Sequence, residues 1–429
     1  METLLTEQNP WWHDRNAISA DRDIVNYSNA SFKIPLPALR AEKGVIVIRG
    51  PRQVGKTTFL KHLAAKEIGL LGPRQVFYFS AESGYPLDKA LREFLDFSGE
   101  GKRVLLIDEA TEDKEWATKV KYLLDSGKMR ESDLIVITGS SSVDLKAGAD
   151  RLPGRGVEGN EFLFFPYSFR DFFPSNPEGC GLADFSEKAA KELALDPQNS
   201  IMFAKYISNG GLPSVWNTER ELARERYARW IEGFISKNGR SILYAREILA
   251  KLAEKTTFDF MGLARETSIS SHHTIEGYVS FFEAGMLGRL LYNYNLATSS
   301  PDPKKEKKFV FIDPFISQIF ISKREEPFLV EDIVGSHLLR ACDELYFHRD
   351  KKGEVDFLCK AGGKLVPVEV KWQEKVAESD ARNLKKFGGG FLLTKDFSGR
   401  FGNVLAVPVP VFLRMIGRTM AIRKPLGQF

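Results

Sequence analysis

Two groups of residues in this chain have the types and spacing of sites that handle phosphate. The first is the stretch GPRQVGKTT, which follows the apolar run GVIVI and precedes a helical pattern. Glycines let backbone N–H groups wrap a phosphate, Lys56 supplies positive charge, and Thr57 offers a hydroxyl to a magnesium ion. The pattern therefore predicts a nucleotide-phosphate site made of Gly50, Pro51, Arg52, Gln53, Val54, Gly55, Lys56, Thr57 and Thr58.

Two further apolar runs end in polar residues that complete this chemistry. The run RVLLIDEA ends in Asp108 and Glu109. An acid at the carboxyl end of a buried parallel strand lies where ligands bind in such sheets. We expect Asp108 to hold the magnesium shell and Glu109 to orient and deprotonate the attacking water. The run DLIVITGSSS places Ser140 near the γ-phosphate or that water, although serines after a strand are also typical of turns.

The second group lies in the stretch GEVDFLCKAGGKLVPVEVKW, which reads as two strands joined at Gly362-Gly363. A two-residue glycine turn is typical of a hairpin and sets its register. In that register Asp356 lies opposite Glu369, with Cβ atoms roughly 5 Å apart, so that the two carboxylates repel each other. A magnesium ion between them would remove the repulsion, and Lys371 could steady the attacking water or the phosphate charge. This arrangement predicts metal-assisted hydrolysis of a phosphodiester.

Two other interpretations of this second group remain open. In one, the group is an ion-pair face in which Glu354 pairs with Lys371 and another base relieves Asp356. In the other, the same side chains bind DNA without cleaving it. Both are compatible with the spacing.

Composition limits the classes of protein to consider. The chain has 429 residues, of which 43% are hydrophobic and 28% charged, values that indicate two to four globular domains. The net charge of +4 permits nucleic-acid binding without arguing for it. No apolar run has the length of a membrane span, and the N-terminus lacks a signal-peptide pattern, so we expect a cytoplasmic protein. The widely spaced Cys180, Cys342 and Cys359 predict neither a disulfide framework nor a zinc site.

The first group resembles the AAA+ ATPases, in particular the archaeal and bacterial group with a nuclease-like C-terminal region. The matching stretches are NPWW, GPRQVGKTT, LLIDEA, TGSSS, LPGRG and FPYSFRDF, which cover most of residues 9–175. The resemblance implies a five-stranded parallel sheet between helices, ATP and Mg²⁺ as cofactors, and a ring-like oligomer. It also implies an arginine supplied by a neighbouring subunit, for which Arg155 is the candidate and Arg151 the second choice. A plain surface arginine at position 155 is the alternative.

The middle of the chain is expected to couple the two groups. The stretch NGGLPSVW is similar to the turn of related ATPase lids, which implies that Pro213 packs near the adenine, unless it is a plain helix-breaking turn. Residues 243–295 look like a winged helix, with Ser270 or Ser271 capping a helix that begins at His272 and His273. Because this helix carries Glu276 and Glu283 and no arginine, a packing role is as compatible as DNA binding.

The second group resembles the PD-(D/E)xK nuclease fold over residues 309–407. Asp356 matches the first acid, Glu369-Val370-Lys371 matches the E-x-K, and Glu331 in PFLVEDIVG matches the additional acid of the preceding helix. The resemblance implies magnesium ligation by Asp356, Glu369 and Glu331. The expected fold class is therefore α/β, with a parallel ATPase sheet, a helical lid, a winged helix and a restriction-endonuclease-like domain.

These patterns predict a series of segments along the chain. They are an N-terminal arm (1–40), an ATPase core (41–178), a helical lid (179–240), a winged-helix domain (241–296), a Pro/Ser/Lys-rich linker (297–308), a nuclease-like domain (309–410) and a basic tail (411–429).

The main functional hypothesis is an ATP-hydrolysing oligomer that binds and remodels branched or structured DNA and carries a magnesium-dependent nuclease-type domain. The alternative is an ATP-dependent switch that recruits a protein partner and keeps an inactive nuclease-like domain. Salt dependence separates them, since binding through several DNA phosphates weakens steeply as salt rises.

Overall fold

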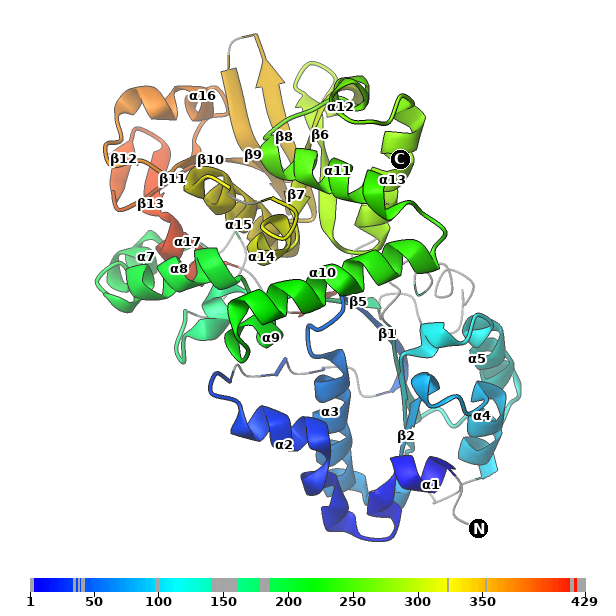
Figure 1. The fold of residues 1–429 in the computed structure, drawn as a ribbon. Helices are drawn as coiled ribbons and strands as arrows, with labels where there is room; N and C mark the ends of the chain where they lie inside the picture. The colour runs from blue at the N-terminus through cyan, green and yellow to red at the C-terminus, as the bar shows by residue number, and fades with distance from the viewer. Residues whose placement is uncertain are drawn as a thin grey trace. The chain divides into compact units, whose positions relative to one another are not determined.

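The structure, a computed structural model, forms two compact units, Met1–Phe165 with Met420–Phe429 and Pro166–Thr419 (Figure 1). The structure describes residues 4–33, 36, 37, 39, 43–96, 101–139, 145, 161–177, 182, 185–321, 324–351, 353–416 and 420–422.

The first unit is built on a sheet of five parallel strands in the order β5-β1-β4-β3-β2. Every residue of β3 and β4 is buried, as expected of strands covered on both faces. The predicted five-stranded parallel sheet is confirmed, and a short antiparallel strand, β14, adds to its β5 edge. The strands are β1 (Gly44–Arg49), β2 (Val76–Ser80), β3 (Val104–Asp108), β4 (Leu134–Thr138), β5 (Glu161–Phe164) and β14 (Met420–Ile422).

Helices cover both faces of this sheet. Figure 1 shows α3 on one side and α4 with α5 on the other. Alternate strand residues such as Phe77, Leu105 and Ile135 form a core with Phe94 of α4 and Trp116 of α5. The α-helices are α1 (Leu4–Gln8), α2 (Arg22–Asn29), α3 (Lys56–Leu71), α4 (Leu87–Asp96) and α5 (Trp116–Asp125), and the 3-10 helices are η1 (Pro10–Trp12), η2 (Arg15–Ala20), η3 (Pro73–Gln75), η4 (Ala81–Ser83) and η5 (Ala110–Glu112).

The NPWW stretch covers the open edge of the sheet at β2. The Asn9 side chain accepts the N–H of Tyr78 at 2.6 Å and donates to the Tyr78 carbonyl at 2.8 Å, as a neighbouring strand would. The indole N–H groups of Trp11 and Trp12 both donate to the carbonyl of Val76 at 3.0 Å. Side chains thus satisfy backbone groups that an edge strand leaves open.

The second unit is built on a mixed sheet in the order β12-β13-β11-β10-β9-β8-β6-β7. Helix α15 packs across one face, where Ile333 and Leu338 join Phe357 and Val368 in a buried core. Helix α16 covers the other face through Leu384. The strands are β6 (Gly288–Asn295), β7 (Ser300–Phe311), β8 (Glu344–Asp350), β9 (Gly353–Ala361), β10 (Lys364–Lys371), β11 (Gly390–Thr394), β12 (Gly399–Phe401) and β13 (Val404–Pro408).

The helices of the second unit include two clusters, one before and one after position 240. Helices α7 to α10 lie in the segment predicted to be a lid, 179–240, η6 precedes that segment, and α11 to α13 follow it. The bounds are η6 (Phe169–Phe172), α7 (Glu187–Leu193), α8 (Gln198–Asn209), α9 (Pro213–Trp216), α10 (Arg220–Lys237), α11 (Ile242–Glu254), α12 (Phe260–Glu266), α13 (His272–Ala284), α14 (Pro314–Ser317), α15 (Glu326–Ala341), η8 (Glu378–Ala381), α16 (Arg382–Lys385) and α17 (Val409–Met415).

The region expected to be a winged helix has three helices followed by the antiparallel pair β6-β7. Ser271 is the residue that caps α13, and its hydroxyl accepts the N–H of Thr274. Strand β6 also pairs with β8, so β6 and β7 belong to the large sheet. The winged-helix assignment therefore stays a prediction.

The structure corrects two expected segments near the C-terminal domain. Residues 297–308 are not a linker, because β7 runs from Ser300 to Phe311 and pairs with β6. The first part of β7 is rich in Pro and Lys and largely exposed, which is why its sequence reads as a linker. The last five residues of β7 are buried, as in an ordinary strand. The expected basic tail likewise begins inside α17, where Val411, Phe412 and Leu413 pack into the core.

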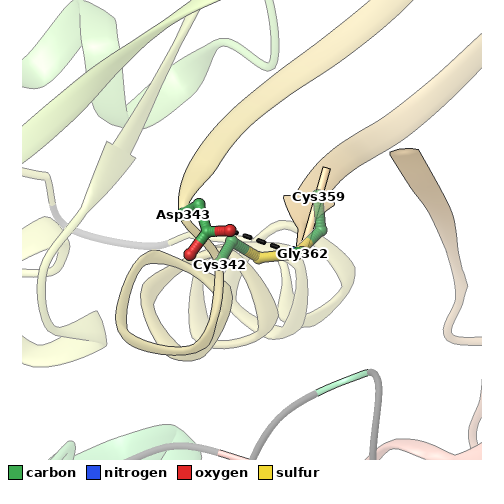
Figure 2. The surroundings of a disulfide bond; sticks show 4 residues. All are labelled: Cys342, Asp343, Cys359 and Gly362. Carbon is green, nitrogen blue, oxygen red and sulfur yellow. Dashed lines mark hydrogen bonds between the residues drawn. A yellow bond between two sulfur atoms is a disulfide. The ribbon is translucent and has the colours of Figure 1, made fainter. Parts of the chain in front are cut away.

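A disulfide that the sequence analysis did not expect joins Cys342 to Cys359 (Figure 2). Cys342 directly follows α15 and Cys359 lies in β9, so packing of the helix on the sheet brings them together. Beside the bond, the Asp343 carboxylate accepts the N–H of Gly362 at 2.9 Å. Closing a loop with a separation of 17 residues contributes about 3 kcal/mol to the stability of the folded chain.

Candidate functional sites

The loop after β1 has the backbone of a phosphate cradle. Gly50 must lack a side chain, because a Cβ there would lie 2.4 Å from the carbonyl oxygen of Phe164 in β5. Gly55 has φ +94°, a left-handed conformation that favours glycine, and α3 begins at the next residue. The loop therefore ends at a helix N-terminus, where N–H groups and the helix dipole favour an anion.

Lys56 is held over this loop. Its ammonium donates to the carbonyls of Gly50 at 3.0 Å and Pro51 at 2.9 Å, and the residue is 4% exposed. Burial lowers the pKa of Lys56, while the nearby Glu109 and Asp108 act in the opposite direction. A phosphate is a stronger partner for this ammonium than two carbonyls, because the hydrogen bond then joins two full charges.

Asp108 is the polar centre of the site. Its carboxylate accepts hydrogen bonds from the hydroxyls of Thr57 at 2.7 Å, Thr138 at 2.5 Å and Tyr78 at 3.0 Å. These donors come from α3, β4 and β2, so the carboxylate is fixed from three sides. The Thr57 hydroxyl and the Asp108 carboxylate lie together beside the cradle. Magnesium prefers hard oxygen ligands of this kind, so the pair fits a magnesium ion.

Glu109 follows Asp108 in a constrained conformation. Its φ of 51° and ψ of 38° are left-handed, and the residue is 8% exposed. Non-glycine residues adopt such values where the surrounding structure holds them, often at functional sites. The turn carries the chain from β3 into η5 immediately beside Asp108.

The structure describes some of the other predicted site residues and not others. Ser140, Arg151 and Arg155 lie outside the described residues. Pro213 begins α9 in the second unit, so its role at the adenine stays a prediction. Arg52 forms an ion pair with Glu82 at 3.0 Å.

Two residues of this site escaped the sequence analysis. Thr138 ends β4 at the position where a polar residue closes an apolar run, a signal that could have identified it. Tyr78 lies in the middle of β2 and carries no such signal. Burial and the carboxylate of Asp108 raise the pKa of Tyr78 far above its ordinary value, so the phenol remains a donor at neutral pH. The ammonium of Lys61 lies 3.6 Å from the centre of the Tyr78 ring.

Replacing Tyr78 by phenylalanine is expected to raise the Mg²⁺ concentration needed for half-maximal ATP turnover and to slow turnover by about tenfold. The reason is the loss of one hydrogen bond to a charged carboxylate. Titration of Mg²⁺ at saturating ATP measures the effect. The matched control is Tyr85→Phe, whose hydroxyl bonds Glu93 instead. An unchanged Mg²⁺ requirement in Tyr78→Phe would show that the phenol does not position Asp108.

The second group of residues lies on the hairpin β9-β10, whose predicted register is confirmed. Ala361 pairs with Lys364, and Phe357 pairs with Val368. Gly362 and Gly363 both have positive φ, 55° and 79°, as a two-residue hairpin turn requires.

Beyond this ladder, the two predicted acids bond across the strands. The N–H of Asp356 donates to the Glu369 carboxylate at 3.3 Å, and the N–H of Val370 donates to the Asp356 carboxylate at 2.8 Å. The acids of β9 and β10 therefore lie next to each other, as the register predicted.

Glu331, Glu354, Asp356 and Glu369 form what we call the acidic cluster, and an unexpected lysine lies among them. The ammonium of Lys308, from β7, lies 2.5 Å from the Glu331 carboxylate, 3.6 Å from that of Glu354 and 3.7 Å from that of Asp356. The sequence did not single out Lys308, because this lysine belongs to a Lys-rich run that was expected to be a solvated linker.

Electrostatics at the acidic cluster follow from burial and crowding. Burial and the charge of Asp356 raise the pKa of Glu369 to about 8, against the opposing effect of Lys371, whose ammonium lies 2.5 Å from it. Burial also raises the pKa of Glu331, to about 7. Burial alone would lower the pKa of Lys308, but Glu331, Asp356 and Glu354 outweigh it and raise the pKa above its ordinary value.

The acidic cluster does not fit the expected magnesium ion. Within the described part of the chain, no group of three or more His, Cys, Asp or Glu residues has a placement that could hold a metal. The magnesium ligation expected of Glu331, Asp356 and Glu369 stays a prediction; in this arrangement the ammonium of Lys308 supplies a positive charge beside Glu331 and Asp356. Glu354 pairs with Lys308 and Arg349, not with Lys371.

Comparisons with known proteins agree with the first site. Residues 42–173 match the family model described as "AAA domain", and residues 327–410 match "Domain of unknown function (DUF4143)". The segment 42–173 is thus similar to AAA domains over its whole length. Across 87% of the chain and 85% of the relative, the sequence is 24% identical to "Uncharacterized protein MJ1637" of Methanocaldococcus jannaschii.

Solved structures of archaeal proteins show a weaker likeness. The Walker-type ATPase paby2304 of Pyrococcus abyssi has a TM-score of 0.40 and 16% identity, covering 72% of this chain and 95% of its own. The ORC1 protein of Aeropyrum pernix, in complex with DNA, has a TM-score of 0.26 and 13% identity, covering 75% of this chain and 92% of its own. Such TM-scores do not establish a common fold. In the described residues, no helix is both long and apolar enough to cross a membrane.

Proposed function

We propose that this protein hydrolyses ATP with Mg²⁺ and uses the cycle to control a DNA-binding C-terminal domain. One observation carries the ATPase proposal. The carboxylate of Asp108, at the end of β3, accepts a hydrogen bond from the hydroxyl of Thr57 in the phosphate cradle. Lys56 and the constrained Glu109 complete the set.

Each residue of the first site has a role in the proposed reaction. Lys56 and the N–H groups of the loop bind the β- and γ-phosphates, and Thr57 and Asp108 would hold Mg²⁺, which neutralises charge on the phosphates when bound. Glu109 accepts a proton from the attacking water, whose oxygen bonds to the γ-phosphorus as the bond to ADP breaks. The products are ADP and phosphate.

We propose DNA, branched or structured, as the partner, and a ring-like oligomer in which Arg155 of one subunit reaches the ATP of its neighbour. The β9-β10 hairpin supports DNA as the partner, because it brings Asp356, Glu369 and Lys371 together as in the nuclease pattern that the sequence resembles. The exposed Lys304 and Lys305 of β7 add positive charge in the same unit.

A protein partner is the second candidate. It is favoured by α13, the helix expected to read DNA, because Glu276 at its exposed start pairs with His273 at 3.8 Å in place of a basic neighbour. The ATPase proposal stands under either partner.

The test is ATP turnover and strand scission with linear, forked and four-way DNA between about 50 and 200 mM salt. We expect DNA to stimulate turnover, with binding that weakens steeply as salt rises, because several phosphate contacts release counterions. Turnover that ignores every form of DNA would remove DNA as the partner and leave the ATPase intact. No turnover under any condition would contradict the ATPase itself.

A further inference from the structure

The acidic cluster holds a cation that the protein itself supplies. Lys308 is 2% exposed, and its ammonium touches carboxylates from both α15 and β9. It also lies 5.1 Å from the centre of the Phe357 ring and 5.6 Å from that of Phe347, contacts that favour a positive charge. Lys308 is therefore a buried, ion-paired lysine and not the solvated end of a lysine run.

The register of β7 directs Lys308 inward. It pairs with Leu291 of β6, and successive side chains of a strand point to opposite faces. Its neighbour Lys307 donates instead to the carbonyls of Pro303 and Lys305 on its own strand. Of the two adjacent lysines, only Lys308 reaches the acidic cluster, and it does so because the sheet places it there.

We propose that Lys308 is a built-in cation that takes the place of a divalent metal, so that the acidic cluster is complete without metal and does not cleave phosphodiesters. A divalent ion bound to Glu331 and Asp356 would meet the ammonium at a distance of a few ångströms, and like charges so close repel strongly when buried. The ammonium also joins α15, β7 and β9 through their side chains, a connecting role that a bound metal often fills.

The residues of the acidic cluster are not those of the ATP site, and their charge balance does not depend on ATP hydrolysis. A cluster that is complete without metal can bind DNA without cutting it, because Lys371 and Glu354 remain partly accessible while Lys308 is buried among the acids. Conversely, removing the ammonium while leaving the carboxylates should create a metal site.

The test compares full-length wild-type protein with Lys308→Met, both free of nucleotide, by calorimetric titration with Mn²⁺ and by thermal unfolding. We expect wild-type protein to bind no Mn²⁺ at the acidic cluster. Lys308→Met should bind about one Mn²⁺ per chain, with a thermal midpoint that rises by more than about 3 °C at saturation. Adding Asp356→Asn to Lys308→Met should abolish this binding.

Controls assign the metal to the cluster. Lys307→Met removes the neighbouring lysine and should bind no Mn²⁺, and Asp108→Asn should leave the new site of Lys308→Met unchanged. If Lys308→Met does not fold, Lys308→Met with Glu331→Gln removes one charge of each sign and keeps Asp356 and Glu369 for the titration.

Two results would overturn the proposal. One is Mn²⁺ binding by wild-type protein that Asp356→Asn removes, and the other is the absence of a new site in the folded Lys308 variants.

Discussion

Replacing Lys56 by alanine is expected to lower ATP turnover by at least about 100-fold. The ammonium of Lys56 brings a positive charge to the cradle. Because it is buried against the carbonyls of Gly50 and Pro51, it faces the phosphate loop and not the solvent. The change should weaken ATP binding as well, because the same charge meets the β- and γ-phosphates before and during the reaction. Steady-state phosphate release and nucleotide binding, measured together, check both effects.

The matched control for this change is Lys66→Ala. Lys66 lies on the same helix, α3, but is exposed to solvent. The control variant should keep wild-type turnover and binding. Turnover within a few-fold of wild type in Lys56→Ala would mean that the cradle does not bind the reacting phosphates.

Replacing Glu109 by glutamine is expected to lower turnover by about 10²- to 10⁴-fold while ATP binding remains close to wild type. The amide keeps the size of the carboxylate but cannot accept the proton of the attacking water. Because Lys56, Thr57 and Asp108 are untouched, the variant should accumulate as an ATP-bound form. Single-turnover hydrolysis and retention of labelled ATP distinguish this outcome from a loss of binding.

The control is Glu112→Gln, an exposed acid three residues further along the same turn. It should behave as wild type. A Glu109 variant that loses ATP binding along with turnover would point to a structural role for the left-handed turn and not to proton transfer. The contrast between Lys56 and Glu109, one change affecting binding and turnover and the other turnover alone, therefore tests the two assigned roles separately.

The sequence alone predicted those features that local rules determine. The apolar run before Gly50, the glycine spacing and the acids after a second apolar run predicted the cradle and the strand that carries Asp108, because each depends on residues within a few positions. The β9-β10 register was predictable for the same reason, since Gly362-Gly363 permits a tight turn and the turn aligns every later pair. The match of residues 42–173 to the AAA domain agrees with the first prediction.

Only the tertiary structure decided what surrounds those residues. Lys308 appears in a Lys-rich stretch typical of a linker, yet pairing of β7 with β6 carries it to Glu331 and Asp356, which are 23 and 48 positions away. Tyr78 reaches Asp108, and Cys342 reaches Cys359, through the packing of separate elements. Local preference specifies a strand, a turn or a loop, but which side chain supplies a counter-charge depends on how sheets and helices pack, and no short stretch of sequence contains that information.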